Sequence, residues 1–160
     1  MGQPRKKGIY PYHQRNINMT ISARNVFKGK VSAIKEGPIN AEVEITTAGG
    51  DKIVAMLTEA SVKSLGLANG VDAVAVVKAS WVTLLSGTPG YRFSARNQLK
   101  GTVSAIVKGA VNSEVTVALT GGSTVFAVVT NEAVTELQLK EGTATVALFK
   151  AGHVLVGVPV

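Results

Sequence analysis

Apolar and polar residues alternate along much of this chain, which is the pattern of β-strands that bury one face. Residues 39–46 alternate without a break, and residues 111–119 repeat the pattern. Each segment runs into a Gly-Gly turn, and a second run rich in β-branched residues follows at 52–57 and at 124–129. Two strands joined by a short turn form a hairpin, so the sequence predicts two β-hairpins.

One short helix is predicted after each hairpin. Thr58 is a suitable N-cap, Glu59 favours the positive end of the helix dipole, and Val62 and Leu65 share one face before Gly66 ends the segment. The segment 72 residues later has a similar pattern. The helices are therefore minor elements in a chain of strands.

Two further strands are predicted after the first helix, at 71–77 and 81–85. The order strand, strand, strand, helix, strand, strand is typical of a small OB-type barrel. We therefore predict an all-β fold with one short helix per repeat, built as two OB-like five-stranded barrels in tandem. A barrel of about 65 residues buries a small fraction of its surface, so we expect apolar surface to be covered in an oligomer.

An internal repeat organises the chain. Residues 22–85 align without a gap on residues 94–157, and 27 of the 64 aligned pairs are identical. The turn-forming residues between the two copies predict a short linker. The predicted organisation is a basic tail at 1–18, a first domain at 19–85, a linker at 86–90 and a second domain at 91–160.

Composition narrows the class of protein. Apolar residues make up 46% of the chain, cysteine is absent, and Lys78 and Lys150 interrupt the two most hydrophobic stretches. These stretches fall short of the roughly 18 apolar residues of a membrane-spanning helix, and the first residues lack the apolar core of a secretory signal. We expect a cytoplasmic protein without disulfides.

Most of the net charge of +7 comes from the first 18 residues. Arg5, Lys6, Lys7 and Arg15 contribute four positive charges and no acid accompanies them, which leaves 7 − 4 = +3 for the rest. Met19 is a candidate natural start, with the preceding residues a cloning remnant or an upstream extension. The alternative is a functional arm that contacts nucleic acid or a membrane surface.

Candidate catalytic groups are sparse. His13 lies in the tail and His153 aligns with Trp81 of the other copy, so no repeated site uses an imidazole. Without cysteine or a histidine cluster, a site for a metal cation is not expected. Outward-facing positions of strands account for the carboxylates, which are Glu42, Glu44 and Glu114. We expect neither an enzyme nor a cofactor.

Hydrogen-bond donors, by contrast, recur without an acidic partner. The tetrapeptide Ser-Ala-Arg-Asn stands at the start of each copy, and its hydroxyl, guanidinium, amide and backbone N–H groups suit a small dianion. The alternative is that Ser and Asn cap a turn and Arg is solvated. The residues are Ser22, Ala23, Arg24 and Asn25, and in the second copy Ser94, Ala95, Arg96 and Asn97.

Two further repeated features suit an anion. Thr58 and Ser61, aligned with Thr130 and Ala133, open the predicted helices, where unpaired N–H groups attract negative charge; plain N-capping is the alternative. Each copy also carries a lysine in an apolar strand, Lys78 or Lys150. Such a lysine either extends its amine to water or meets a negative charge, and an incoming anion is a candidate partner.

Together these motifs resemble the molbindin family, whose members consist of Mop domains, and in particular a tandem di-Mop protein. The resemblance covers residues 19 to about 158, nearly all of the chain beyond the tail. It rests on the two Ser-Ala-Arg-Asn segments, the Gly37 and Gly109 turns, the segment 58–67 and the two Lys-Ala pairs.

The resemblance implies barrels arranged six around an axis, hence a homotrimer, that binds molybdate or the near-isosteric tungstate between domains or subunits. Matching positions supply the ligand-contacting candidates. They are Ser22, Ala23, Arg24, Thr58, Ser61, Lys78 and Ala79 in the first copy, and Ser94, Ala95, Arg96, Thr130, Lys150 and Ala151 in the second. Asn25 and Asn97 are included as members of the motif, and Asn40 and Asn112 are weaker candidates for axial sites. Ala133 lacks the family hydroxyl.

Four functions compete at this point. The first is storage and homeostasis of molybdate without catalysis. The second is the sensor module of a molybdate-responsive transcription regulator, which would need a winged helix-turn-helix that 18 polar residues cannot form. A nucleic-acid-binding OB protein would need more aromatic stacking residues. An enzyme is the least favoured.

Overall fold

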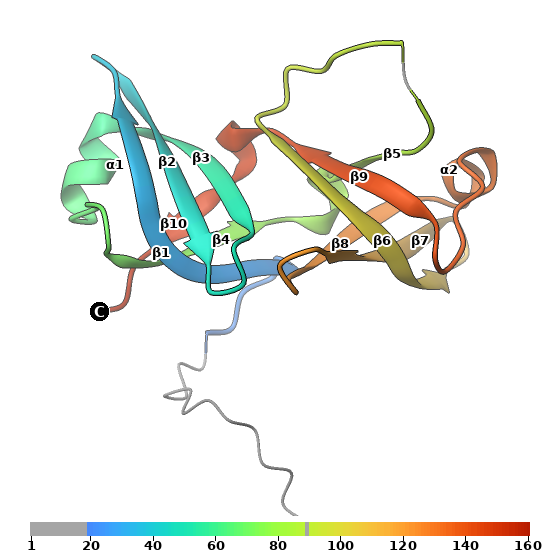
Figure 1. Cartoon of the computed structure of the whole chain (residues 1–160). Coiled ribbons are helices and arrows are strands. Elements are labelled where there is room, and N and C mark those ends of the chain that lie inside the picture. Colours follow the sequence, from blue (N-terminus) through green and yellow to red (C-terminus); the bar gives the residue numbers. More distant parts are fainter. Residues whose placement is uncertain (1–18, 89) are drawn as a thin grey trace, which may run out of the picture.

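The computed structural model describes residues 19–88 and 90–160 (Figure 1). The predictions for the tail, His13 and Pro89 fall on residues outside these ranges. The first repeat contains β1 (Asn25–Glu36), β2 (Asn40–Thr47), β3 (Lys52–Thr58), α1 (Glu59–Ser64), β4 (Asp72–Val77), the 3₁₀ turn η1 (Ala79–Trp81) and β5 (Thr83–Leu85). The second contains β6 (Asn97–Lys108), β7 (Asn112–Leu119), β8 (Thr124–Thr130), α2 (Asn131–Glu136), β9 (Ala144–Phe149), η2 (Ala151–His153) and β10 (Leu155–Gly157).

The predicted fold class is confirmed. The described residues form two antiparallel sheets of five strands, each with one short helix, and the sheets curl beside one another (Figure 1). The strand orders are β10-β4-β1-β2-β3 and β5-β9-β6-β7-β8.

The sequence predicts that each repeat completes its own barrel, but in the structure the fifth strand of each sheet comes from the other repeat. β5 of the first repeat pairs with β9 of the second, and β10 of the second repeat pairs with β4 of the first. The registers are equivalent, since Thr83 lies opposite Leu148 and Leu155 lies opposite Val76. Because β4 and β9 occupy equivalent positions in the two repeats, β5 or β10 can form the same pattern of backbone hydrogen bonds with either of them. The domain limits 19–85 and 91–160 stay a prediction about the repeat.

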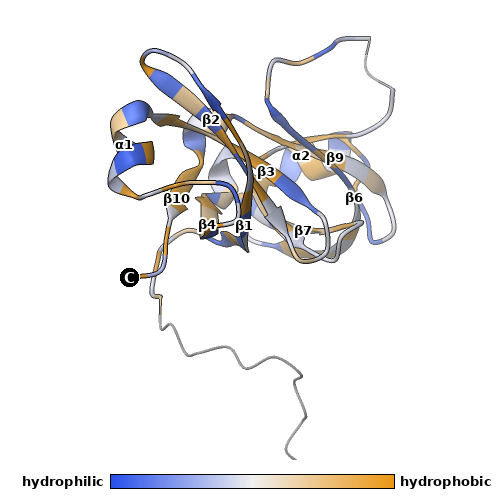
Figure 2. Ribbon diagram, turned by 60° about the vertical axis from the view of Figure 1, so that its left-hand side comes forward, coloured by the Kyte–Doolittle hydropathy of each residue, from blue (hydrophilic) through white to orange (hydrophobic). Residues whose placement is uncertain are grey.

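The core follows from the alternation of apolar residues. In β2, every second residue from Ala41 to Ile45 is buried, while Glu42 and Glu44 on the other face are partly exposed. Hydropathy colouring of the ribbon shows the same alternation along the strands (Figure 2). Thr58 caps α1 as predicted, because its hydroxyl accepts a hydrogen bond from the backbone N–H of Ser61 at 3.1 Å.

The two hairpin turns meet where the repeats adjoin. A Cβ atom on Gly49 would lie 1.7 Å from the carbonyl oxygen of Gly121, so only glycine fits. The Asp51 carboxylate accepts hydrogen bonds from the backbone N–H groups of Gly121 and Ser123, both at 3.0 Å. The first repeat thus stabilises the turn of the second.

Considerable apolar surface stays open in the single chain. Ile39 and its repeat counterpart Val111 are 74% and 70% exposed, each in the turn between two strands. A cavity of about 920 Å³ runs beside β1 and β4, with Met19, Ile21 and Val26 among its mostly apolar lining.

Candidate functional site

The second Ser-Ala-Arg-Asn segment and Lys150 border one pocket. Asn97 lies opposite Phe149 in the ladder of β6 and β9, so the residues before Asn97 and those after Phe149 emerge at the same end of the sheet. Ser94, Ala95 and Lys150 all line a pocket of about 280 Å³ there. Among the described residues that line this pocket, none is acidic. The hydroxyl and the ammonium group are donors suited to an anion.

The exchanged strand adds residues of the first repeat to this pocket. Trp81 and Thr83 line it together with His153, and the Trp81 and His153 rings stack with centroids 4.3 Å apart. Phe93 also lines it. Phe93 was not among the predicted site residues. His153, which the sequence indicates is a surface or packing residue rather than a catalytic one, contacts Trp81 with the two rings tilted by 39°. Trp81 and His153 occupy equivalent positions in the two repeats, and this equivalence is the feature of the sequence that could have indicated their contact.

The two lysines lie just beyond the strands rather than inside them, which corrects the prediction. Lys78 follows the last residue of β4, Lys150 follows the last residue of β9, and both side chains are exposed. Within residues 19–88 and 90–160, no carboxylate lies within ion-pair distance of either lysine. Their ammonium groups are therefore available to an incoming anion.

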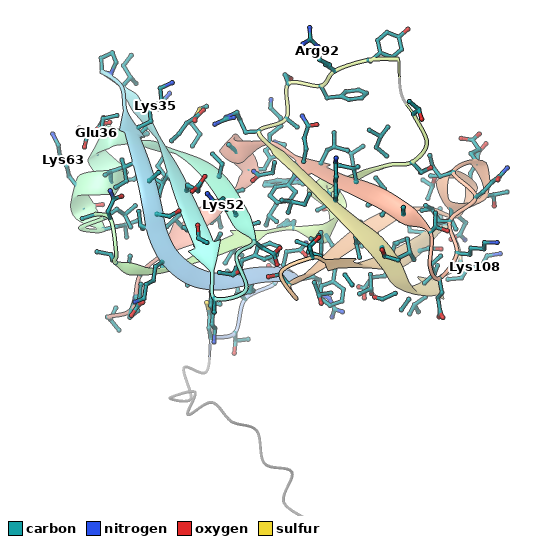
Figure 3. All side chains as sticks on the ribbon, in the orientation of Figure 1. Lys35, Glu36, Lys52, Lys63, Arg92 and Lys108 are labelled. Carbon is teal, nitrogen blue, oxygen red and sulfur yellow. The ribbon has the colours of Figure 1, made fainter. Side chains whose placement is uncertain are left out.

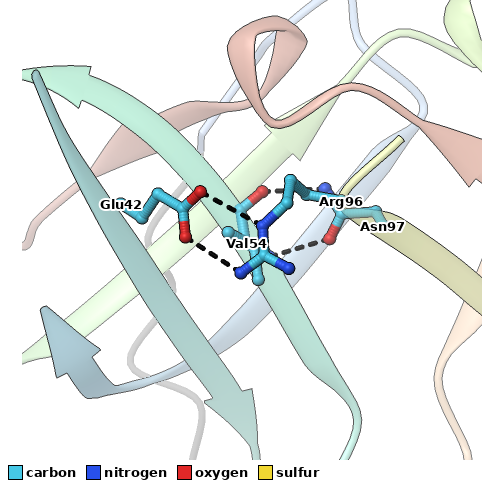
Figure 4. A network of polar contacts seen from close by, with 4 residues as sticks. All are labelled: Glu42, Val54, Arg96 and Asn97. Carbon is cyan, nitrogen blue, oxygen red and sulfur yellow. Dashed lines mark hydrogen bonds and ion pairs between the residues drawn. The ribbon is translucent and has the colours of Figure 1, made fainter. Parts of the chain in front are cut away.

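The arginines do have acidic partners, contrary to the sequence-based expectation. Arg96 Nε donates to Glu42 Oε1 at 3.1 Å and Arg96 Nη2 donates to Oε2 at 2.9 Å, across the boundary between repeats (Figure 4). Arg24 Nη2 donates to Glu114 Oε1 at 2.9 Å in the equivalent pair, and its guanidinium carbon lies 5.0 Å from the centroid of the Phe126 ring. Glu42 and Glu114 are thus partners of the arginines and not merely solvated.

The ion pair shifts both ionisation equilibria at the second site. The hydrogen bond from Arg96 has the largest effect and lowers the pKa of Glu42 below its ordinary value of 4.5. Burial opposes it, and the charges of Arg96 and Lys35 add smaller decreases. The Glu42 carboxylate raises the pKa of Arg96. Both groups are charged at neutral pH.

Asn25 and Asn97 hold the repeats together instead of facing a ligand. Asn97 Nδ2 donates to the carbonyl oxygen of Val54 and the Val54 N–H donates to Asn97 Oδ1, both at 2.8 Å (Figure 4). Asn25 makes the equivalent pair with Phe126, at 2.8 and 2.7 Å. Both asparagines are buried. Because each amide is buried and spends its oxygen and one of its two N–H groups on the opposite repeat, we assign Asn25 and Asn97 a structural role and leave them out of the proposed ligand set.

The helix-start residues lie at another end of the sheets. The Thr58 and Ser61 hydroxyl oxygens are 2.9 Å apart, and Thr130 accepts a hydrogen bond from the Ala133 N–H. Among the described residues, no hydrogen bond joins these side chains to a Ser-Ala-Arg segment. However, η2 packs on β3 and η1 packs on β8, so each Lys-Ala pair lies beside the strand that carries the threonine of the opposite repeat.

The weaker candidates lie near those helix starts. Asn40 is opposite Thr58 in the ladder of β2 and β3, and Asn112 is opposite Thr130 in the second repeat. Each asparagine carbonyl accepts a hydrogen bond from the glycine N–H of its turn. Both residues are exposed, which leaves their side chains accessible.

Charged groups elsewhere are dispersed. The side chains of Lys35, Lys63, Arg92 and Lys108 point outward from separate parts of the molecule (Figure 3). No group of three or more potential metal ligands occurs among residues 19–88 and 90–160. No helix in the described part of the chain is long and apolar enough to cross a membrane.

Comparison with known proteins gives a consistent result. The model of the TOBE domain matches residues 21–84 and again 94–156. A molybdenum transport protein ModE from Herbaspirillum seropedicae is 43% identical over 144 residues, which cover 90% of this chain and 54% of that protein. The molybdenum-pterin-binding protein MopA from Rhodobacter capsulatus is 38% identical over 144 residues, with the same coverage of both chains. The chain therefore spans about half the length of these curated relatives.

A solved structure extends the comparison to three dimensions. It is described as the cytoplasmic molybdate-binding protein ModG with molybdate bound. It is 58% identical to this chain, with a TM-score of 0.84, and the match covers 88% of this chain and 100% of that one.

Proposed function

This chain belongs to the TOBE domain family, and from that premise we propose that it binds molybdate, or the near-isosteric tungstate, reversibly and without catalysis. Its role would be storage and homeostasis of the oxyanion in the cytoplasm. The main support is the pocket that joins Ser94, Ala95 and Lys150 without an acidic lining residue. The similarity to the molybdate-binding ModG structure supports the identity of the anion.

The proposed ligand-contacting residues come from both repeats. Hydroxyl, backbone N–H, guanidinium and ammonium donors together match the four acceptor oxygens of a tetrahedral dianion. In the first repeat they are Ser22, Ala23, Arg24, Thr58, Ser61, Lys78 and Ala79. In the second they are Ser94, Ala95, Arg96, Thr130, Lys150 and Ala151, while Asn40 and Asn112 stay weaker candidates for axial sites.

We also propose a homo-oligomer, with a homotrimer as its form. The exposed Ile39 and Val111 and the apolar cavity beside β1 and β4 support this proposal, since large open apolar surfaces mark interaction sites. Additional oxyanion sites would then lie between subunits, where the helix starts and the Ser-Ala-Arg segments of different chains meet.

The second candidate function is the sensor module of a molybdate-responsive regulator. One observation favours it: this chain spans about half of the ModE relative, so the same fold also serves in longer proteins. Storage and sensing require the same anion site, so anion binding tests both.

The deciding experiment is isothermal titration of the chain with molybdate, with sulfate and phosphate as controls and light scattering for the oligomeric state. Tight binding that excess sulfate does not displace, on a trimer, is the expected result. Absence of molybdate heat would overturn the proposal. Binding of the molybdate-loaded chain to DNA fragments would favour sensing over storage.

A further inference from the structure

The inference concerns the two arginine–glutamate pairs, and it rests on the proposed oxyanion function. Arg96 follows Ser94 and Ala95, yet it is not among the residues that line their pocket. Its guanidinium instead contacts Glu42 of the opposite repeat through two hydrogen bonds (Figure 4). The Nε and Nη2 side, one of the two donor pairs with which a guanidinium can hold two oxygens of an oxyanion, is therefore occupied.

The same arrangement occurs twice. Arg24 and Glu114 form the equivalent pair, which is joined by one hydrogen bond instead of two. In each repeat the glutamate lies on the partly exposed face of β2 or β7, the strand next to the β3 or β8 edge of its sheet. Each repeat thus supplies a carboxylate to the arginine of the other repeat's site.

Stability does not require these pairs. The arginine side chains are 55% and 58% exposed, and exposed ion pairs contribute little to folding. The neighbouring asparagines already join the same strands through buried hydrogen bonds. The pairs are thus weak enough to open when a stronger anion competes for the guanidinium.

A bound dianion and the glutamate would also repel each other. A dianion that takes the Arg96 fork comes close to the Glu42 carboxylate, and like charges at short range raise the free energy of the complex. Lys35 lies opposite Glu42 in the ladder of β1 and β2 and adds a minor lowering of the pKa of this carboxylate to that caused by Arg96, whereas Glu114 has Val107 in that place.

We propose that Glu42 and Glu114 are built-in competing anions, which hold Arg96 and Arg24 away from the oxyanion until it displaces them. The displacement sets the affinity below the value that the free arginines would give. Because an exposed pair is weak, the reduction is modest, up to about fivefold at each site. A store that must release its anion benefits from such a weakened site.

The test compares molybdate titrations of the full chain with Glu42→Gln, Glu114→Gln and the control Glu44→Gln. Glutamine keeps the size of the side chain and removes its charge. Glu44 lies on the same face of β2 and acts on Arg96 through its charge alone, while its side-chain contacts are with Ser32 and Lys52. Melting temperatures and nuclear magnetic resonance signals of the arginine Nε–H groups, recorded with and without molybdate, accompany each titration.

The expected result is that Glu42→Gln and Glu114→Gln each tighten one class of site up to about fivefold, while Glu44→Gln, which removes a charge that does not contact the arginine, changes the affinity less. The Arg96 Nε–H signal should move when Glu42 is replaced and again when molybdate is added. If the wild type binds molybdate and both glutamine variants bind it with unchanged or weaker affinity, the competing-anion proposal is overturned and the oxyanion function stands. If Glu42→Gln binds molybdate and the wild type does not, the competition is supported and the proposed function of the wild-type chain is overturned. Absence of binding in all variants overturns both.

Discussion

Lys150 shows how a single residue at the end of a strand can serve a binding site. Its ammonium group borders the pocket and lacks a carboxylate partner in the described part of the chain. Lys150→Met removes the charge and keeps most of the apolar stem, so molybdate affinity should fall about 10- to 100-fold, as expected for a lost charge-assisted hydrogen bond. Isothermal titration measures the change. Lys63→Met on α1 is the control, and equal affinities in the two variants would exclude the role of Lys150.

Asn97, by contrast, is buried, and its side-chain amide is hydrogen-bonded to the backbone of the other repeat. Asn97→Ala leaves the N–H and carbonyl groups of Val54 without partners and should lower the free energy of unfolding by about 2–4 kcal/mol. Denaturant unfolding measures the loss. The exposed Asn40→Ala variant should lie within about 0.5 kcal/mol of the wild type. A stable Asn97→Ala protein would mean that the repeats do not depend on this contact.

Glu42 links the ion pair to acid stability. Because its pKa is lower in the folded state, the ionised carboxylate stabilises the fold above its ordinary pKa of 4.5. This contribution is lost as the pH falls from that value through the lowered pKa. Melting temperatures measured from neutral pH to below pH 4.5 should therefore fall less for Glu42→Gln than for the wild type. Identical pH profiles would show that the pair has no net effect on folding.

At the scale of elements, the contact between the two hairpin turns gives a test of the boundary between repeats. Gly49→Ala would place Cβ against the carbonyl oxygen of Gly121, so one turn must move, at a cost of about 1–3 kcal/mol. Thermal and denaturant unfolding measure this change. Gly152→Ala is the matched control, since a Cβ there meets open space. Equal stability of the two variants would argue that the turns separate freely.

The hairpins and short helices follow from local sequence patterns, whereas the exchange of strands between the sheets does not. The strict alternation around Val43 and the Thr58 cap are local signals, so the hairpins and helices were predictable from the chain. The exchange of β5 and β10 was not, because equivalent edges of β4 and β9 accept either strand. Of the repeated serines and lysines, Ser94 and Lys150 line one pocket, while their role in anion binding stays a prediction. The Glu42–Arg96 pair joins residues 54 positions apart, and a pattern based on sequence neighbours cannot find it.

For the whole molecule, anion binding and stability are linked. A ligand that binds only the folded protein stabilises it by RT ln(1 + [L]/Kd), or about 2.7 kcal/mol for one site at a hundredfold excess over Kd. Molybdate should therefore raise the melting temperature, and the same concentration of sulfate should raise it less. A scan of melting temperature against concentration of each anion measures this difference. A melting temperature indifferent to molybdate would contradict the proposed function.

The exchanged strands also determine what a cut in the backbone would do. Arg92 is exposed in the loop between β5 and β6, and its side chain points away from both sheets (Figure 3). Cleavage of the chain after this residue would yield two fragments of which each still supplies an edge strand to the sheet of the other. Neither fragment alone would contain all the strands of a sheet. The two fragments should therefore stay associated after cleavage, held by the hydrogen bonds of the exchanged strands.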